Sequence, residues 1–222
     1  MSEIQRNSDR EVGSDNTEAR ISAPAAALFF LLLFIPIIST VFFGAVDRSA
    51  IGILAVLSSI IVLLWAWISV RERCFRLGSP WLLAPLAGLV LIGFVQLLPL
   101  AGSPPGADLL TVPASTALSI DPFATRMFLI RLIIYLLFFA AVLTFIRSEK
   151  RVKVAVITIV SFGGLMAFYA ILQRMAGAEA IYGIRETPFA IPFGSFVNQH
   201  HFAALMEMTA GLGLGLLFGA GV

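Results

Sequence analysis

The residues best suited to chemistry lie in one short stretch near the end of the sequence, Phe193 to Glu207, which reads FGSFVNQHHFAALME. The stretch holds the two histidines of the chain, His200 and His201, shortly after Asn198. An imidazole can act as a general base toward a hydroxyl group, because its ordinary pKa of about 6.5 suits neutral conditions. We therefore predict that His201 is a catalytic base, with His200 and Asn198 beside it in substrate binding. The structural alternative is that Asn198 caps a helix and both imidazoles rest at a membrane interface.

Three arginines lie inside or at the edge of apolar segments, namely Arg126, Arg131 and Arg174. A cation at membrane depth costs several kcal/mol unless it is paired or hydrated, so such residues tend to be functional. The guanidinium fork matches phosphate oxygens, and three arginines that meet at one side of a membrane would bind a phosphate or a diphosphate. The alternative is that these long side chains reach outward to the lipid headgroups.

Glu207 is the one acidic residue deep in an apolar segment, and it lies seven residues after His200 on the same helical face. We interpret Glu207 as a structural partner for a buried arginine, either Arg131 or Arg174. A histidine and a glutamate on one helix lack a third donor, so the sequence predicts no metal site, and it indicates no other cofactor. Glycines recur later at a spacing of four, which favours packing against another helix over phosphate binding; they are Gly211, Gly215 and Gly219.

The elements that must position these residues follow from the composition. Hydrophobic residues make up 59% of the 222 residues and charged residues 13%, whereas soluble domains are about 45–50% apolar and about 25% charged. The apolar segments fit helices, which need about 20 residues to cross a bilayer, and are too long for barrel strands. We therefore predict an all-α fold, a polytopic transmembrane helix bundle. No basic cluster is interleaved with aromatic residues, which argues against nucleic-acid binding, and the single cysteine, Cys74, excludes an internal disulfide.

The chain divides into a polar tail and about six spans. Residues 1–21 carry mixed charges without hydrophobic periodicity and are expected to form a disordered cytoplasmic tail. Residues 22–222 are expected to form the transmembrane domain, with spans at about 24–46, 50–70, 81–100, 122–146, 154–174 and 198–221. Pro36 should kink the first span, and Asp121 with Pro122 should start the fourth. No basic anchor follows the sixth span, so we expect the sequence to be truncated at its C-terminus.

Lysines and arginines are distributed unevenly over the predicted loops. Ten of them lie in the tail and in two basic loops, 71–76 and 147–153, whereas the opposite loops hold Arg48 and Arg185. The positive-inside rule places the N-terminus and both basic loops in the cytoplasm. The loops 101–121 and 175–197, and with them the Asn198 end of the last span, are then expected to face outward.

The stretch around the histidines also resembles a known family. Its pattern is similar to the segment that opens a transmembrane helix in O-antigen ligases and O-antigen polymerase-related membrane proteins; the matching residues are Gly194, Phe196, Asn198, His201 and Ala203. The family usually has a second asparagine where this chain has His200. The segments LSIDPFATRMFLIRL (118–132) and YAILQR (169–174) resemble further parts of the family in the expected order, and residues 1–100 match only as generic spans.

This resemblance implies a glycosyltransferase at the periplasmic side of a bacterial inner membrane, surrounded by membrane lipids. Such an enzyme moves a glycan from undecaprenyl diphosphate to a lipid A-core sugar or another glycan acceptor, without a cofactor, and outward-facing arginines would neutralise the departing diphosphate. The family carries important arginines and a histidine in a large periplasmic loop between later helices. This chain has no such loop, so His201 is not equated with that histidine, and the sequence is expected to be an amino-terminal portion. Two alternatives stay open: a transporter or lipid-linked glycan flippase, and an inactive fragment or non-catalytic membrane subunit.

Overall fold

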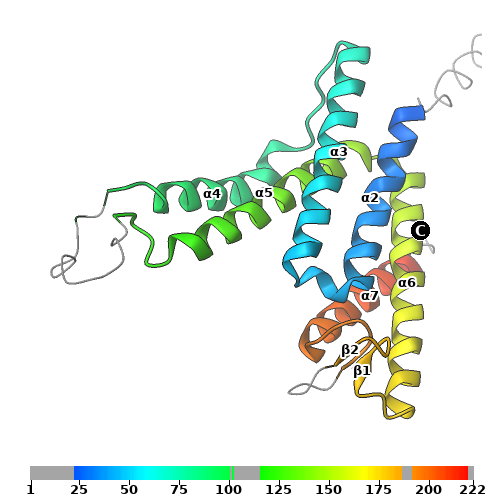
Figure 1. Cartoon of the computed structure of the whole chain (residues 1–222). Coiled ribbons are helices and arrows are strands. Elements are labelled where there is room, and N and C mark those ends of the chain that lie inside the picture. Colours follow the sequence, from blue (N-terminus) through cyan, green and yellow to red (C-terminus); the bar gives the residue numbers. More distant parts are fainter. Residues whose placement is uncertain (1–22, 101, 103–115, 187–191, 220–222) are drawn as a thin grey trace, which may run out of the picture.

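The computed structural model describes residues 23–100, 102, 116–186 and 192–219. The predicted tail 1–21 and most of the loop 101–121 lie outside these residues. The described part is built from six α-helices: α2 (Ala23–Val41), α3 (Arg48–Glu72), α4 (Pro80–Gln96), α5 (Pro122–Phe145), α6 (Glu149–Met175) and α7 (Gln199–Gly219) (Figure 1). A short 3-10 helix, η1 (Phe43–Ala45), lies between α2 and α3. Strands β1 (Ala180–Ile181) and β2 (Arg185–Glu186) pair as an antiparallel hairpin after α6. The predicted helical fold class is confirmed.

Five of the described helices are long and apolar enough to cross a membrane, and they indicate a multi-pass membrane protein. They cover Pro24–Val41, Ser49–Glu72, Pro122–Phe145, Glu149–Met175 and Gln199–Gly219. Helix α4 is also apolar but has 17 residues. At 1.5 Å per residue it measures about 26 Å, somewhat less than the hydrocarbon core of roughly 30 Å.

Three helices differ from the predicted spans at one end. The first helix ends at Val41 rather than at 46, because the backbone enters left-handed conformations from Phe43 onward. Helix α4 ends at Gln96 rather than at 100, where the chain turns. Helix α6 begins at Glu149 rather than at 154, because the Ser148 hydroxyl accepts a hydrogen bond from the Arg151 amide at 3.3 Å and caps the helix. The second basic loop is therefore mostly the first turns of a helix.

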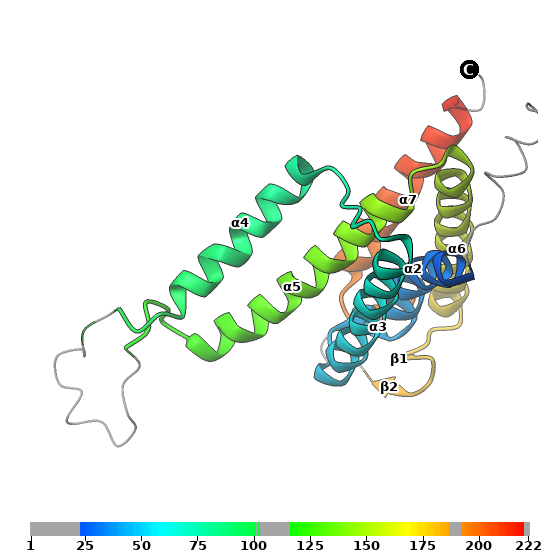
Figure 2. The same cartoon turned by 90° about the horizontal axis from the view of Figure 1, so that it is seen from above.

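Helices α2, α3 and α6 run side by side, whereas α4 and α5 form a pair that projects sideways from them (Figures 1 and 2). The near half of α5 still packs into the group through a buried cluster that includes Leu32, Ile61, Ala140 and Ala141. Asp121 caps the far end of α5, as predicted, by accepting a hydrogen bond from the Ala124 amide at 2.9 Å.

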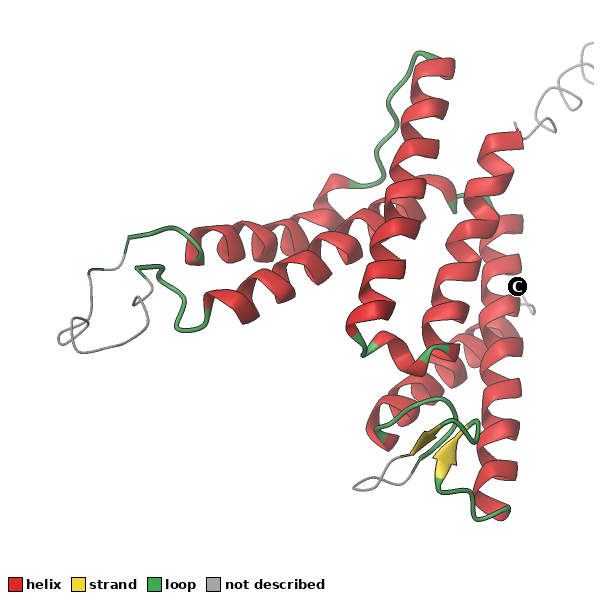
Figure 3. Ribbon diagram, in the orientation of Figure 1, coloured by secondary structure: helices red, strands yellow, loops and turns green. Residues whose placement is uncertain are grey.

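Different elements lie at the two ends of the α2–α3–α6 group. One end, called the hairpin end, holds η1 and the β1–β2 hairpin, which is yellow in Figure 3. The other, called the basic end, is where α3 and α5 finish and α6 begins. Residues on α6 and α7 pack together near the hairpin end around a second buried cluster, which consists of Met166, Ala170, Phe196 and Phe202.

Candidate functional site

A cavity of about 320 Å³ lies where the connector between α2 and α3 (Phe42–Asp47) meets α3, α5 and α7. Arg131 of α5 and His201 of α7, both predicted to take part in chemistry, line this cavity together with Tyr135. The rest of the lining is small or aliphatic: Gly44, Ala45, Val46, Ile51, Leu54 and Ile134. The cavity therefore combines a permanent cation and an imidazole with largely apolar walls.

The connector wall of the cavity has a strained backbone. Phe43, Gly44 and Ala45 have φ angles of 55°, 69° and 55°, in the left-handed region. For a residue other than glycine, this backbone conformation costs about 1–2 kcal/mol of free energy. The surrounding contacts must therefore hold Phe43 and Ala45 in place. At Gly44 a side chain is also excluded by space, because an added Cβ would lie 2.7 Å from Cε1 of Phe196.

The β1–β2 hairpin holds this connector through a set of contacts that we call the clasp. The Arg185 guanidinium donates to the Asp47 carboxylate at 2.6 Å and lies 5.0 Å from the ring centroid of Phe43. The Tyr182 hydroxyl donates to the Val41 carbonyl oxygen at 3.2 Å, and its ring lies 6.0 Å from that of Phe43. These contacts join the hairpin to both ends of the connector.

Tyr182 lies outside the helices, and its phenol is partly removed from water. Burial raises the pKa of Tyr182 above its ordinary value of 10.0, while an interaction with the Ser195 hydroxyl lowers it and the nearby Tyr169 raises it further. The Tyr182 and Tyr169 rings stack with their centroids 5.5 Å apart. The phenol therefore stays protonated at neutral pH and acts as the donor of the bond to Val41.

The stretch that begins at Phe193 serves mainly to shape the entry to α7. Gly194 has a φ of 63°, and an added Cβ would lie 2.9 Å from the Phe202 ring. The Asn198 side chain accepts a hydrogen bond from the His200 amide at 2.9 Å. The structural alternative for Asn198, a helix cap, is thus what the structure contains. The turn seats Phe196 against Gly44 and starts α7 so that His201 reaches the cavity.

Of the seven candidate residues, the structure brings Arg131 and His201 to one cavity. Arg126 lies more than a turn farther along the projecting part of α5, and Arg174 lies in the last turn of α6. Both are exposed, as Arg131 and His201 also are, but neither lines this cavity. The three arginines therefore do not share this cavity. His200 is exposed beside His201 and does not line the cavity.

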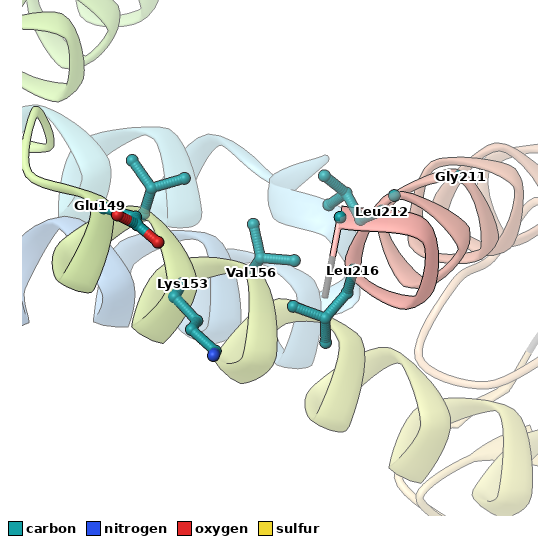
Figure 4. A pocket seen from close by; sticks show the side chains of 9 residues that line it. Glu149, Lys153, Val156, Gly211, Leu212 and Leu216 are labelled. Carbon is teal, nitrogen blue, oxygen red and sulfur yellow. The ribbon is translucent and has the colours of Figure 1, made fainter. Parts of the chain in front are cut away.

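Glu207 is exposed on α7, and the ion pairs Arg76–Glu72 and Arg185–Asp47 do not include it. The expected pairing of Glu207 with Arg131 or Arg174 is thus not formed in this structure. The glycine stripe at spacing four also differs from its expected packing role, since a Cβ added at Gly211, Gly215 or Gly219 would meet nothing within 4 Å. These glycines line an open groove of about 310 Å³ between α6 and α7 (Figure 4).

Sequence reasoning missed the clasp. Its ion pair joins residues 138 positions apart, so no local spacing connects Asp47 with Arg185. The available signal is that two opposite charges lie in loops predicted on the same side of the membrane. Phe43 and Tyr182 carry no such signal, because their role depends on the backbone geometry of a turn.

The fold and the composition define a class, a helical multi-pass membrane protein with a cavity at the hairpin end. No protein-family model, curated protein or solved structure matches this chain. The resemblance to the O-antigen ligases therefore stays a prediction.

Proposed function

We propose that the protein is a glycan ligase or polymerase of the bacterial inner membrane, and that the cavity at the hairpin end is its site. The observation that carries this proposal is that Arg131 and His201, which come from different helices, line the same cavity. A lipid-linked donor has a diphosphate headgroup on a long apolar chain. A cavity with one guanidinium and aliphatic walls, set among membrane-length helices, suits both parts of such a molecule.

The proposed reaction assigns one task to each polar residue. Arg131 binds the diphosphate and stabilises the charge that develops on it. His201 takes the proton from the acceptor hydroxyl as that oxygen forms a bond to the anomeric carbon of the donor sugar. The bond from that carbon to the diphosphate oxygen breaks, and undecaprenyl diphosphate leaves with the electron pair. The acceptor is a lipid A-core sugar or another glycan, presented from the periplasmic side.

The test uses the purified full-length protein in vesicles that contain an undecaprenyl-diphosphate-linked glycan with a radioactive label. Transfer of label to an added glycan acceptor is measured for His201→Ala and Arg131→Gln. We expect His201→Ala to lower the rate about 100-fold or more, which is typical for removal of a general base. Arg131→Gln should weaken donor binding by about tenfold or more, as expected for the loss of a hydrogen bond between charged groups.

The chain offers matched controls, because each site residue has a neighbour of the same type away from the cavity. His200→Ala and Arg126→Gln should keep near-normal transfer, since neither residue lines the cavity. Equal losses in the control and site variants would contradict the proposal. A flippase would be identified by a different result. The donor would bind in a way that depends on Arg131 and the labelled lipid would move across the vesicle bilayer, but no label would be transferred to the acceptor.

A further inference from the structure

A second cavity, of about 240 Å³, lies at the basic end, away from the residues proposed for catalysis. Five segments meet around it: the start of α2, the end of α3, the chain after α3, the end of α5 and the start of α6. Its lining is Ala25, Trp65, Ile68, Ser69, Glu72, Cys74, Arg76, Thr144, Phe145 and Arg151. The cavity thus contains residues from both segments that the charge distribution singled out as basic loops.

Three hydrogen bonds from arginines lie at the basic end, and one of them joins the chain after α3 to the chain between α5 and α6. The Arg147 guanidinium donates to Leu77 O and to Leu143 O, each at 3.1 Å. Arg151 donates from Nη1 to Phe145 O at 2.7 Å. Because a guanidinium has five N–H donors in a fixed fork, this one bond leaves further donors on Arg151 for an anion.

The second arginine of the cavity is held loosely. Arg76 approaches the Glu72 carboxylate at 3.6 Å, and its side chain is 68% exposed. This contact is long for a hydrogen bond, so Arg76 can turn toward another anion at small cost. The charges that line the cavity are therefore two guanidinium groups against one carboxylate. Outside the lining, Arg147 lies just before α6, and the first turns of α6 carry Lys150 and Lys153 beside one acidic residue, Glu149.

The other side of the cavity is apolar. Trp65 stacks against Phe75 with ring centroids 5.6 Å apart and meets the edge of Phe145 at 5.8 Å, and Ile68 is buried beside them. Trp67, two residues after Trp65, is 62% exposed at the same level of α3. Tryptophans of this kind mark the boundary between lipid tails and headgroups. The cavity therefore offers cations next to apolar surface at the height where a phospholipid changes from tail to headgroup.

We propose that this cavity binds the phosphate group of an anionic phospholipid, with Arg151 and Arg76 as ligands and the Trp65 side against the upper part of the acyl chains. Basic pockets between transmembrane helices bind such headgroups through charge-assisted hydrogen bonds. A soluble phosphate compound would use the arginines but gain nothing from the apolar side, which is why the lipid is the occupant. This site is independent of the transfer reaction proposed above.

Trp65 provides a reporter inside the cavity. The full chain, with Trp67→Phe and Trp81→Phe so that Trp65 alone fluoresces, is placed in phosphatidylcholine vesicles. Brominated phosphatidylglycerol or brominated phosphatidylcholine is then added, and quenching of Trp65 is measured against the mole fraction of brominated lipid. We expect phosphatidylglycerol to reach half-quenching at about a tenfold lower mole fraction, as one retained charge-assisted contact would give.

Three variants separate a built site from general attraction to the basic end. Arg151→Gln should remove most of the preference for phosphatidylglycerol, whereas Lys150→Gln removes the same charge from the same helix outside the cavity lining and should leave the preference largely intact. Glu72→Gln should increase the preference, because it removes the carboxylate that competes for Arg76. This third variant keeps the test decisive if Arg151→Gln, which also removes the bond to Phe145, fails to fold by circular dichroism.

Equal quenching by the two lipids would overturn the proposal, and so would an equal effect of Lys150→Gln and Arg151→Gln. A preference that Glu72→Gln lowers would also overturn it. Glycerol phosphate in the buffer is expected to leave the quenching unchanged; if it displaces the lipid at millimolar concentration, the site belongs to a soluble phosphate compound and the lipid assignment is wrong.

Discussion

Replacing Gly44 by alanine should destabilise the protein strongly, because Gly44 is the contact between the connector and the stretch that starts α7. The new Cβ would occupy a left-handed backbone position with φ of 69°, at a cost of about 1–2 kcal/mol. It would also lie 2.7 Å from Cε1 and 2.9 Å from Cδ1 of Phe196. The ring would have to move, and such overpacking costs about 1–3 kcal/mol. The two terms together predict a loss of about 2–5 kcal/mol in the free energy of unfolding.

The assay is unfolding in mild-detergent micelles by added denaturing detergent, followed by far-ultraviolet circular dichroism. Gly52→Ala is the matched control, because Gly52 lies in α3 with nothing within 4 Å of an added Cβ. Because alanine favours a helix more than glycine does, Gly52→Ala should raise the free energy of unfolding by up to about 1 kcal/mol. A second control repeats Gly44→Ala in a Phe196→Leu background, where the cost should fall toward the backbone share of about 1–2 kcal/mol.

Two results would refute this reasoning. If Gly44→Ala unfolds at the same detergent fraction as Gly52→Ala, then neither the left-handed backbone nor the close approach of Phe196 exists in solution. If the cost of Gly44→Ala is the same with and without the Phe196 ring, the loss is backbone strain alone. The connector would then not be joined to the stretch that starts α7 in the way described here.

Three further predictions concern the cap, the clasp and the Tyr182 phenol. Asn198→Ala should cost about 0.5–2 kcal/mol in the same unfolding assay, because the His200 amide loses its partner, whereas Asn198→Asp should keep the cap and its stability. Asp47→Asn should lower the free energy of unfolding by no more than about 1 kcal/mol, because the side chains of Arg185 and Asp47 are 31% and 41% exposed. A loss of several kcal/mol would mean that this ion pair is shielded from water, contrary to these exposures. Because burial raises the pKa of Tyr182 above 10.0, its protonated form stabilises the folded state; that contribution is complete below pH 10 and is lost as pH rises through the higher folded pKa. Stability should thus fall above about pH 10, Tyr182→Phe should flatten this fall, and the difference absorbance of the phenolate near 295 nm should show the late titration.

Local patterns in the sequence predict the helices well, and the tertiary arrangement less well. Asp121 with Pro122 marks the start of α5 because a cap needs only neighbouring atoms. The start of α6 is missed by five residues, since a run of lysines and arginines looks like a loop although Ser148 already caps a helix there. The sideways course of α5 has no signature in its sequence. That course separates Arg126 from the cavity and leaves Arg131 in the lining that also holds His201. Each candidate residue could be picked out from the sequence on its own, but which of them share a cavity could not.

The candidate site depends on a small set of contacts that no single segment supplies. His201 reaches the cavity because the turn after Phe193 starts α7 in the right place, and that turn is fixed where Phe196 meets Gly44. The connector that carries Gly44 is strained, and the clasp from the β1–β2 hairpin holds it. The pattern that resembles a glycosyltransferase family is therefore, in this chain, first of all a packing motif. Its phenylalanine, Phe196, packs against Gly44 in the wall of the cavity, and its histidine, His201, lines the cavity itself.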